Sequence, residues 1–200
     1  ASWSAAKAEK SLDGIIPAPR TIGPAEGSFT LKNATALVVE ARDTLFWEVA
    51  GDFAAQSALT TGCKLLPGPV NPRSRIVLRQ VPGLGSEAYR LTVVPDEVLV
   101  EASSAHGAFY GIQTLCQLLP AAIYGDTRAK GVRWQAPCCR IEDEPHFPYR
   151  GMMLAVGHYF MPPEKALKLI ALMPWPKQNN IPVHLAEYFT SHTALTHYPH

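Results

Sequence analysis

The sequence has no run of like charges and no long apolar stretch. Its 18 lysines and arginines nearly balance its 17 aspartates and glutamates, which leaves a net charge of +1. Nucleic acids and anionic membrane surfaces attract clustered basic residues, so the overall charge predicts neither as a partner. A membrane helix needs about 20 consecutive, mostly apolar residues, and no stretch of this sequence approaches that length. We therefore expect no membrane span.

Cysteine is scarce, and its spacing excludes two common uses. No two of the four cysteines show C-x-x-C spacing, so neither a zinc knuckle nor a redox motif is expected. Cys138 and Cys139 are adjacent and would bridge each other only with strain. We interpret the cysteines as free or buried thiols, and the sequence indicates no metal and no cofactor.

The N-terminal residues lack the pattern of a folded element. Residues 1–13 are polar and rich in small side chains, and we expect a flexible lead-in. The chain begins at Ala1, and its first residues show no basic segment followed by an apolar one, so no signal peptide is recognisable in them.

Hydrophobic periodicity predicts an α+β domain over residues 14–137. Apolar residues recur at helical spacing over 45–60 and over 105–119, so a helix is expected at each. Strands are expected at 14–20, within 29–39, and at 75–78, 89–93 and 98–100. We predict an antiparallel sheet with both helices on one face, a sandwich large enough for its own core.

Residues 138–200 have a different pattern. A strand is expected within 147–160, a helix from Pro162-Pro163 to about Met173, and a second strand at 180–185. A strand, a helix and a strand in this order form a βαβ unit, with which α/β domains begin. The acidic residues at 142–144 lie before the first of these strands, and we interpret them as a solvated linker turn.

Two segments carry a resemblance to a known family. Ala105-His-Gly-Ala-Phe-Tyr-Gly-Ile-Gln-Thr-Leu-Cys-Gln-Leu-Leu119 resembles the Gly-x-Phe-Tyr-Gly-x-Gln-Thr-Leu-x-Gln-Leu signature of family-20 glycoside hydrolases, the β-N-acetylhexosaminidases. Ile141-Glu-Asp-Glu-Pro-His-Phe-Pro-Tyr-Arg-Gly151 is similar to the segment by which these enzymes enter their barrel. The resemblance implies a non-catalytic N-terminal domain, followed here by only the first βαβ part of a truncated (β/α)8 catalytic domain.

The resemblance also implies an activity and a compartment. Family members remove terminal β-linked N-acetylglucosamine or N-acetylgalactosamine, with the 2-acetamido group of the sugar as nucleophile. An Asp-Glu pair near the end of the fourth barrel strand supplies the orienting anion and the general acid. This chain stops after the second strand, so we expect no catalytic residue in it and no activity from it alone. The implied partner is an N-acetylhexosamine-containing glycan, and the implied location is secreted, periplasmic or lysosome-like.

Sugar-binding positions are expected at the carboxyl ends of the two barrel strands. The first family strand reads Leu-Asp-x-x-Arg-His-Phe, and this sequence has Ala155 for the Asp and His158 for the Arg. In the second strand His184 is retained, and Glu187 stands in place of an Asp. By position, the substrate-binding candidates are His158, His184 and Glu187. The sequence does not indicate the oligomeric state.

Two other interpretations compete with a truncated enzyme. The altered strand motifs also fit a catalytically dead relative that serves as a carbohydrate-binding or scaffold module. A metal site from His184, His192, His197 and His200 is disfavoured, because their spacings match no common zinc pattern.

Overall fold

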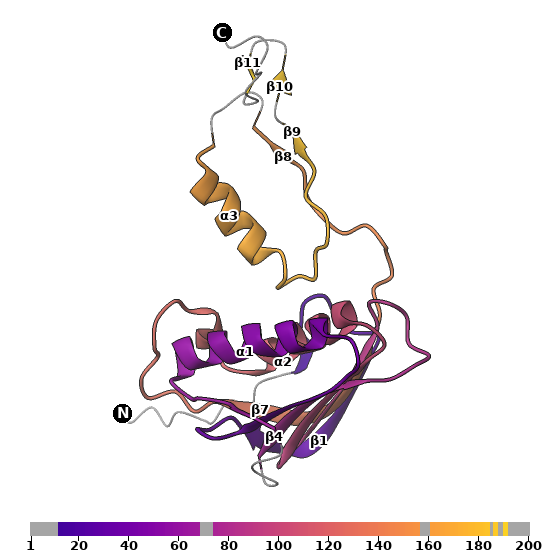
Figure 1. Ribbon diagram of the computed structural model, residues 1–200, viewed down its shortest axis with the longest axis vertical. Coiled ribbons are helices and arrows are strands. Elements are labelled where there is room, and N and C mark those ends of the chain that lie inside the picture. The colour runs from indigo at the N-terminus through magenta and orange to yellow at the C-terminus, as the bar shows by residue number, and fades with distance from the viewer. Residues whose placement is uncertain (1–11, 69–73, 157–160, 185, 188–189, 192–200) are drawn as a thin grey trace, which may run out of the picture. The chain divides into compact units, whose positions relative to one another are not determined.

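The computed structural model describes residues 12–68, 74–156, 161–184, 186–187 and 190–191, the last two segments through their backbone only. Within this part of the chain no helix is both long and apolar enough to cross a membrane. The chain divides into two compact units, residues 1–145 and 146–200 (Figure 1). Each unit is described by itself.

The first unit is built on a seven-stranded mixed sheet with the order β1-β7-β5-β6-β4-β2-β3. The strands are β1 (Thr21–Thr30), β2 (Ala36–Glu40), β3 (Leu66–Pro67), β4 (Arg75–Gln80), β5 (Tyr89–Val94), β6 (Glu97–Ala102) and β7 (Gln135–Asp143). The four strands β1, β7, β5 and β6 pair antiparallel, whereas β6, β4, β2 and β3 pair parallel. The expectation of an antiparallel sheet is therefore confirmed for the β1-β7-β5-β6 half and wrong for the half that contains β4, β2 and β3. The helix after β2 carries the chain back across the sheet, and such a crossover makes the next strand parallel.

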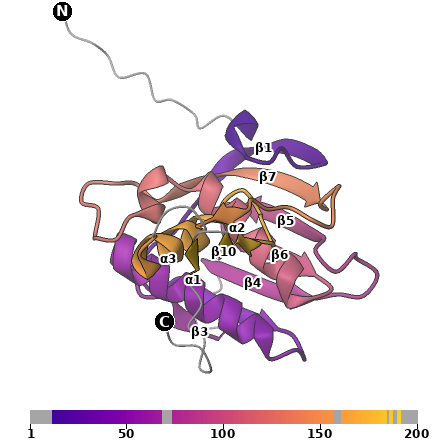
Figure 2. The same ribbon diagram turned by 90° about the horizontal axis from the view of Figure 1, so that it is seen from above.

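Two helices cover one face of this sheet, as the sequence predicts (Figures 1 and 2). Helix α1 spans Leu45–Thr61 and ends at Gly62, whose φ of 74° is the left-handed conformation typical of a helix end. Helix α2 spans Ala105–Leu118, and the Ser104 hydroxyl caps it by accepting a hydrogen bond from the Gly107 N–H at 3.4 Å. Two short 3-10 helices, η1 (Leu12–Gly14) and η2 (Ala121–Tyr124), complete the unit.

Side chains along the β5–β6 hairpin alternate between the buried core and the outer face of the sheet. Tyr89, Leu91 and Val93 are buried, and they pack in one core with Ile112 and Leu115 of α2. Among the intervening residues, Arg90 and Glu101 are charged, and their register continues into a row across five strands in which the sign alternates. The row is Glu40, Arg79, Glu101, Arg90 and Glu142. Opposite charges placed side by side stabilise the outer face.

Strand β7 extends the first unit beyond the boundary expected at residue 137. It continues to Asp143, so the predicted linker turn at 142–144 is wrong for Glu142 and Asp143, which pair with Arg90 and Tyr89 of β5. Pro137 lies within β7 opposite Ser28 of β1. The β5 pairing begins only at Cys139, so the proline, which has no N–H to donate, occupies a part of β7 with one neighbour.

The edge strand is displaced from its predicted position. The sequence places it at 14–20, whereas β1 begins at Thr21 and has an irregular register between Pro24 and Ser28. Residues 12 and 13 of the expected lead-in belong to η1, and residues 1–11 lie outside the described part.

The second unit contains the expected βαβ arrangement. Strand β8 (Leu154–Ala155) is followed by α3 (Pro163–Leu172) and by β9 (Val183–His184), which pairs parallel with β8. A further pair, β10 (Ala186–Glu187) and β11 (Thr190–Ser191), is antiparallel. Both prolines at 162 and 163 precede or begin α3, and the helix ends at Leu172 beside Pro174, as predicted.

Helix α3 is largely uncovered within the described part of the chain. None of its residues is buried, and its apolar side chains Leu167 and Ile170 are 64% and 47% exposed. These two side chains are therefore largely open to solvent, whereas Met173, directly after the helix, is buried. Parallel strands normally occur in sheets with both faces covered, and the described residues of this unit do not provide such a cover for α3.

Candidate functional site

The carboxyl ends of β8 and β9 are the place where the sequence predicts substrate-binding residues. The register pairs Ala155 of β8 with His184 of β9, and the Val156 N–H donates to the His184 carbonyl at 3.0 Å. Leu154 is buried, whereas Ala155 and His184 are exposed. Two strand ends therefore lie side by side and present an imidazole next to a methyl group. An imidazole can donate to or accept from a sugar hydroxyl.

The other two candidates are described only in part or not at all. His158 lies outside the described residues. Glu187 belongs to β10 and pairs through its backbone with Thr190, while its side chain is outside the description. Of the three candidates, the structure thus describes the side chain of His184 alone and locates it at the expected strand end.

The opposite end of this unit is held by Arg150, which sequence reasoning missed. Its guanidinium donates to the carbonyl of Lys177 at 2.8 Å and to that of Phe147 at 2.7 Å. Its backbone N–H donates to Asn179 Oδ1 at 3.0 Å, and its carbonyl accepts from the Asn179 N–H at 2.8 Å. These contacts join the segment before β8 to the segment before β9. The arginine of the Phe-Pro-Tyr-Arg-Gly string therefore has a structural role, because it connects these two segments by hydrogen bonds.

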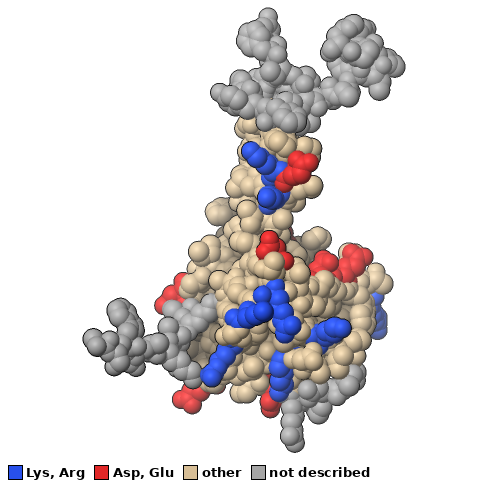
Figure 3. Space-filling model, turned by 90° about the vertical axis from the view of Figure 1, so that its left-hand side faces the viewer, with Lys and Arg blue, Asp and Glu red and all other residues tan. Residues whose placement is uncertain are grey.

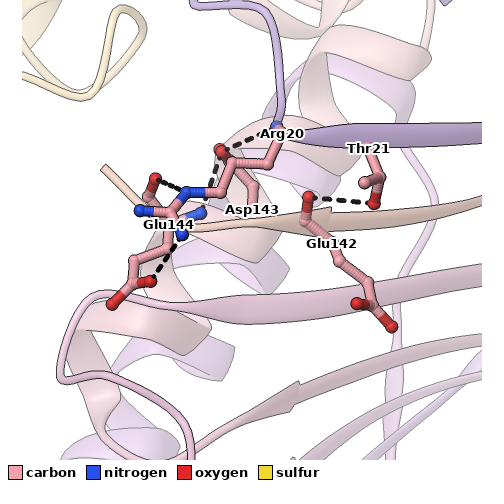
Figure 4. A network of polar contacts seen from close by, with 5 residues as sticks. All are labelled: Arg20, Thr21, Glu142, Asp143 and Glu144. Atoms are coloured by element: carbon pink, nitrogen blue, oxygen red, sulfur yellow. Dashed lines mark hydrogen bonds and ion pairs between the residues drawn. The ribbon is translucent and has the colours of Figure 1, made fainter. Parts of the chain in front are cut away.

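The acidic residues 142–144 are occupied by contacts within the first unit (Figure 4). The Arg20 guanidinium forms an ion pair with the Glu144 carboxylate at 3.0 Å and donates to the Glu144 carbonyl at 3.0 Å. The backbone N–H of Arg20 donates to Asp143 Oδ1 at 3.3 Å. Asp143 Oδ2 also accepts from the Tyr89 hydroxyl at 3.1 Å. These carboxylates tie β1, β5 and β7 together, which explains them without a catalytic role.

The buried end of this network lies at Tyr89. Its hydroxyl is 2.6 Å from Thr114 Oγ1 of α2, and the side chain is 1% exposed. Burial raises the pKa of Tyr89, and the nearby Asp143 charge raises it further. The phenol therefore stays protonated and serves as a donor, which is a packing role.

The signature segment of α2 is explained by its neighbours. Gly107 and Gly111 pack so closely that a Cβ would overlap the Ala88 carbonyl oxygen or the Val100 side chain. Tyr110 donates to Glu87 Oε1 at 3.3 Å. Gln117 bonds the backbone of Ile16 in both directions, at 2.7 and 2.8 Å. The segment thus holds α2 to the sheet and to the N-terminal segment, which is a structural role.

No metal centre is formed in the part of the chain that the structure describes, where no three His, Cys, Asp or Glu side chains gather as ligands. Of the four histidines weighed as a metal site, His184 is described, and the other three lie outside. The cysteines are free thiols. Burial raises the pKa of Cys139 to about 11, so this thiol remains protonated at neutral pH.

The mixed sheet, the two helices on one face and the α2 signature define a class of protein. Residues 13–144 match the family model described as glycosyl hydrolase family 20, domain 2. This match covers more than half of the chain. The chain belongs to glycosyl hydrolase family 20 and contains the N-terminal domain of that family.

Individual relatives agree with this assignment. The chain is 32% identical over 187 residues to a beta-hexosaminidase of Porphyromonas gingivalis, covering 92% of this chain and 24% of that protein. It is 28% identical over 177 residues to a beta-N-acetylhexosaminidase of Cellulomonas fimi, covering 86% and 34%. The chain therefore spans only a quarter to a third of the length of these relatives.

Solved structures extend the likeness to the fold. The N-acetyl-beta-hexosaminidase of Streptomyces plicatus, in complex with Thio-NAglucal, superposes with a TM-score of 0.84 at 30% identity. The superposition covers 94% of this chain and 37% of that one. The GH20 exo beta-N-acetylglucosaminidase of Vibrio harveyi, in complex with N-acetylglucosamine, gives a TM-score of 0.80 at 25% identity, covering 94% and 28%.

Proposed function

We propose that this chain is the N-terminal part of a β-N-acetylhexosaminidase, an exo-glycosidase that removes terminal β-linked N-acetylglucosamine or N-acetylgalactosamine. The observation that carries the proposal is the family-20 match over residues 13–144, followed by a βαβ unit. The first unit is the non-catalytic domain. The second is the opening βαβ part of a (β/α)8 barrel, whose remaining strands and helices lie beyond His200.

The exposed face of α3 supports the barrel assignment. A (β/α)8 barrel takes about 250 residues and packs each helix against its strands. Only 55 residues follow Pro145, and α3 has no buried residue. Further strands and helices would cover Leu167 and Ile170 in the complete protein. By itself the second unit cannot close a barrel.

The proposed reaction is retaining hydrolysis assisted by the substrate. The carbonyl oxygen of the 2-acetamido group attacks the anomeric carbon, a Glu protonates the leaving oxygen, and an adjacent Asp stabilises the oxazolinium ion. Both acids belong to the Asp-Glu pair expected beyond this chain, so the 200 residues alone are inactive. Within the chain, His158, His184 and Glu187 are the residues proposed to contact sugar hydroxyls.

A second candidate is a catalytically dead relative that binds carbohydrate or acts as a scaffold. It is favoured by the exposed Ala155 at the end of β8, where the resemblance leads one to expect an Asp. An alanine there offers no hydrogen bond to a sugar. The family resemblance also supports a secreted, periplasmic or lysosome-like location for the whole protein.

The full-length gene product distinguishes the two candidates. The enzyme releases nitrophenol from 4-nitrophenyl N-acetyl-β-D-glucosaminide but not from 4-nitrophenyl β-D-glucoside, which lacks the acetamido nucleophile. Nuclear magnetic resonance of the first product should show the β-anomer. Equal hydrolysis of both substrates would contradict substrate assistance, and hydrolysis of neither would favour the dead relative.

A further inference from the structure

Three segments far apart in sequence meet at one end of the first unit. The Leu31 N–H donates to the Trp134 carbonyl at 2.8 Å, and the Ala34 N–H donates to the Lys64 carbonyl at 3.0 Å. The Ala129 N–H donates to the Thr60 carbonyl at 2.9 Å. These bonds join residues 31–35, 60–64 and 126–134. The segments carry five exposed cations, which we call the basic face: Lys32, Lys64, Arg128, Lys130 and Arg133.

The basic face differs from most other cationic side chains of this unit, where Arg42 is the one described cation outside the face that forms no ion pair. Five arginines elsewhere form ion pairs with carboxylates: Arg20, Arg75, Arg79, Arg90 and Arg140. In the described part of the chain, no ion pair involves a member of the basic face. A cation without a carboxylate neighbour keeps its full attraction for an external anion.

Charge is segregated to this end of the unit. The three segments hold five cations and one acid, Asp126, so their net charge is 5 − 1 = +4. The whole chain has a net charge of +1, so all other residues together sum to 1 − 4 = −3. Figure 3 shows lysine and arginine side chains close together on the side of the first unit that faces left in Figure 1. The near-zero net charge of the whole chain does not reveal this difference between the three segments and the other residues.

A shallow depression of about 430 Å³ lies within the basic face. Arg128 and Lys130 line it together with the backbone and small side chains of Ala129, Gly131 and Val132. Trp134, the aromatic residue of its lining, is only 6% exposed. The surface therefore offers positive charge and small apolar groups but no open ring on which a nucleic-acid base could stack.

Helix stabilisation explains only part of this arrangement. The Arg128 guanidinium lies against Gly62 at the C-terminal end of α1, where a cation interacts favourably with the helix dipole. Lys64 is two residues further on. Lys32 and Arg133, however, flank the hydrogen bond between Leu31 and Trp134 and lie on other segments. The helix end accounts for neither of them.

We infer that the basic face binds a sulfate- or carboxylate-bearing glycan, at a site in the non-catalytic domain. The inference rests on the proposed function, because a glycan-trimming enzyme meets such anions on the chains that it processes. A polyanion held by several cations releases its condensed counterions, so affinity falls steeply with salt. Lysine and arginine on three segments suit an anionic chain lying across the face. The absence of an exposed ring in the lining disfavours single-stranded nucleic acid.

The test is binding of heparin to the 200-residue chain, measured by isothermal titration calorimetry at 20 and 200 mM NaCl. Unsulfated dextran and a single-stranded DNA of equal charge are the competing probes. The test variant is Lys64→Gln/Lys130→Gln. The matched control, Arg42→Gln/Lys165→Gln, removes two exposed cations outside the basic face, and thermal unfolding verifies that both variants are folded.

Heparin should bind at low salt and dextran should not. The test variant should bind on the order of tenfold more weakly, because two of five counterion-releasing contacts are lost, while the control stays within about twofold. Absence of heparin binding, equal losses in both variants, or tighter binding of DNA than of heparin would each overturn the inference. Hydrolysis of 4-nitrophenyl N-acetyl-β-D-glucosaminide by the full-length protein is measured separately. If the full-length protein shows no hydrolysis while heparin binding is intact, the proposed function is refuted, but the inference that the basic face binds anionic glycans is retained.

Discussion

Gln117 of α2 and Ile16 of the N-terminal segment are joined by two hydrogen bonds across 101 residues of sequence. The Gln117 Nε2 group donates to the Ile16 carbonyl at 2.7 Å, and the Ile16 N–H donates to Gln117 Oε1 at 2.8 Å. The side-chain amide thus forms hydrogen bonds with both the N–H and the carbonyl of Ile16, as a neighbouring strand would. The last glutamine of the signature therefore has a structural purpose.

Replacing Gln117 by alanine should lower the free energy of unfolding by about 1–2 kcal/mol, because two partly exposed hydrogen bonds are lost. Urea unfolding followed by circular dichroism measures this change. Gln113→Ala is the control, since the Gln113 side chain makes no hydrogen bond within the described part of the chain, and it should change stability by less than about 0.5 kcal/mol. Equal effects of the two substitutions would show that the pairing contributes nothing.

Two helix glycines should respond oppositely to alanine. A Cβ on Gly107 would overlap the backbone carbonyl of Ala88, so Gly107→Ala should destabilise the chain by about 1–3 kcal/mol. A Cβ on Gly51 of α1 would have no neighbouring atom within 4 Å, so Gly51→Ala should stabilise by about 0.5–1 kcal/mol through helix propensity. Differential scanning calorimetry gives both signs. A stabilising Gly107→Ala would refute the close contact between α2 and the strand region.

Stability should fall in alkaline solution through Cys139. Burial raises the pKa of this thiol from 9.0 to about 11, so the folded state holds the proton more tightly than the unfolded state. That contribution is present below pH 9 and is lost as the pH rises through 11. Between pH 8.5 and 10.5 the free energy of unfolding should therefore fall by roughly 2 kcal/mol through Cys139, at about 1.36 kcal/mol per pKa unit.

The check is urea unfolding at both pH values, with reductant, for the parent chain and Cys139→Ala. Tyr89 and Tyr124 also have raised pKa values, so the parent loses stability from several groups. The variant should lose roughly 2 kcal/mol less than the parent over this pH interval. The same loss in both chains would mean that the thiol does not titrate as described.

Helix α3 should exchange its amide hydrogens much faster than α2. None of the residues of α3 is buried, whereas ten residues of α2 are. Opening a helix costs little free energy when few buried apolar contacts hold it. Hydrogen exchange measured by mass spectrometry on peptides within 163–172 and 105–118 compares the two helices directly. Equal protection of the two helices from exchange would contradict the proposal that the second unit is the first part of a larger barrel.

Local periodicity was enough to predict both helices of the first unit and the β5–β6 hairpin. Their buried residues recur at the spacing of one element, so neighbouring positions carry the information. Strand β1 was misplaced because it is a largely exposed edge strand with Pro24 and Gly27 and an irregular register. Parallel pairing of β2, β4 and β6 was missed because strand direction depends on the crossover, which alternation does not encode.

The candidate site could be predicted only where one segment carries it. The end of β9 with His184 follows from a single strand, and the structure locates it there. The basic face was not predicted, since its cations come from three segments that meet only through the Leu31–Trp134, Ala34–Lys64 and Thr60–Ala129 hydrogen bonds. Arg150 was missed for a similar reason, because its partners Lys177, Asn179 and Asn180 are distant in the sequence.

The most direct test of the account compares the 200-residue chain with the full-length gene product in one assay. Both are incubated with 4-nitrophenyl N-acetyl-β-D-glucosaminide, and heat-killed protein gives the background. The full-length protein should release nitrophenol, whereas residues 1–200 should not exceed the background, because losing a general acid alone removes about 10²–10⁴-fold in rate. Turnover by the 200-residue chain that is abolished by His184→Ala or Glu187→Gln would contradict the account, since it would show a complete active site within these residues.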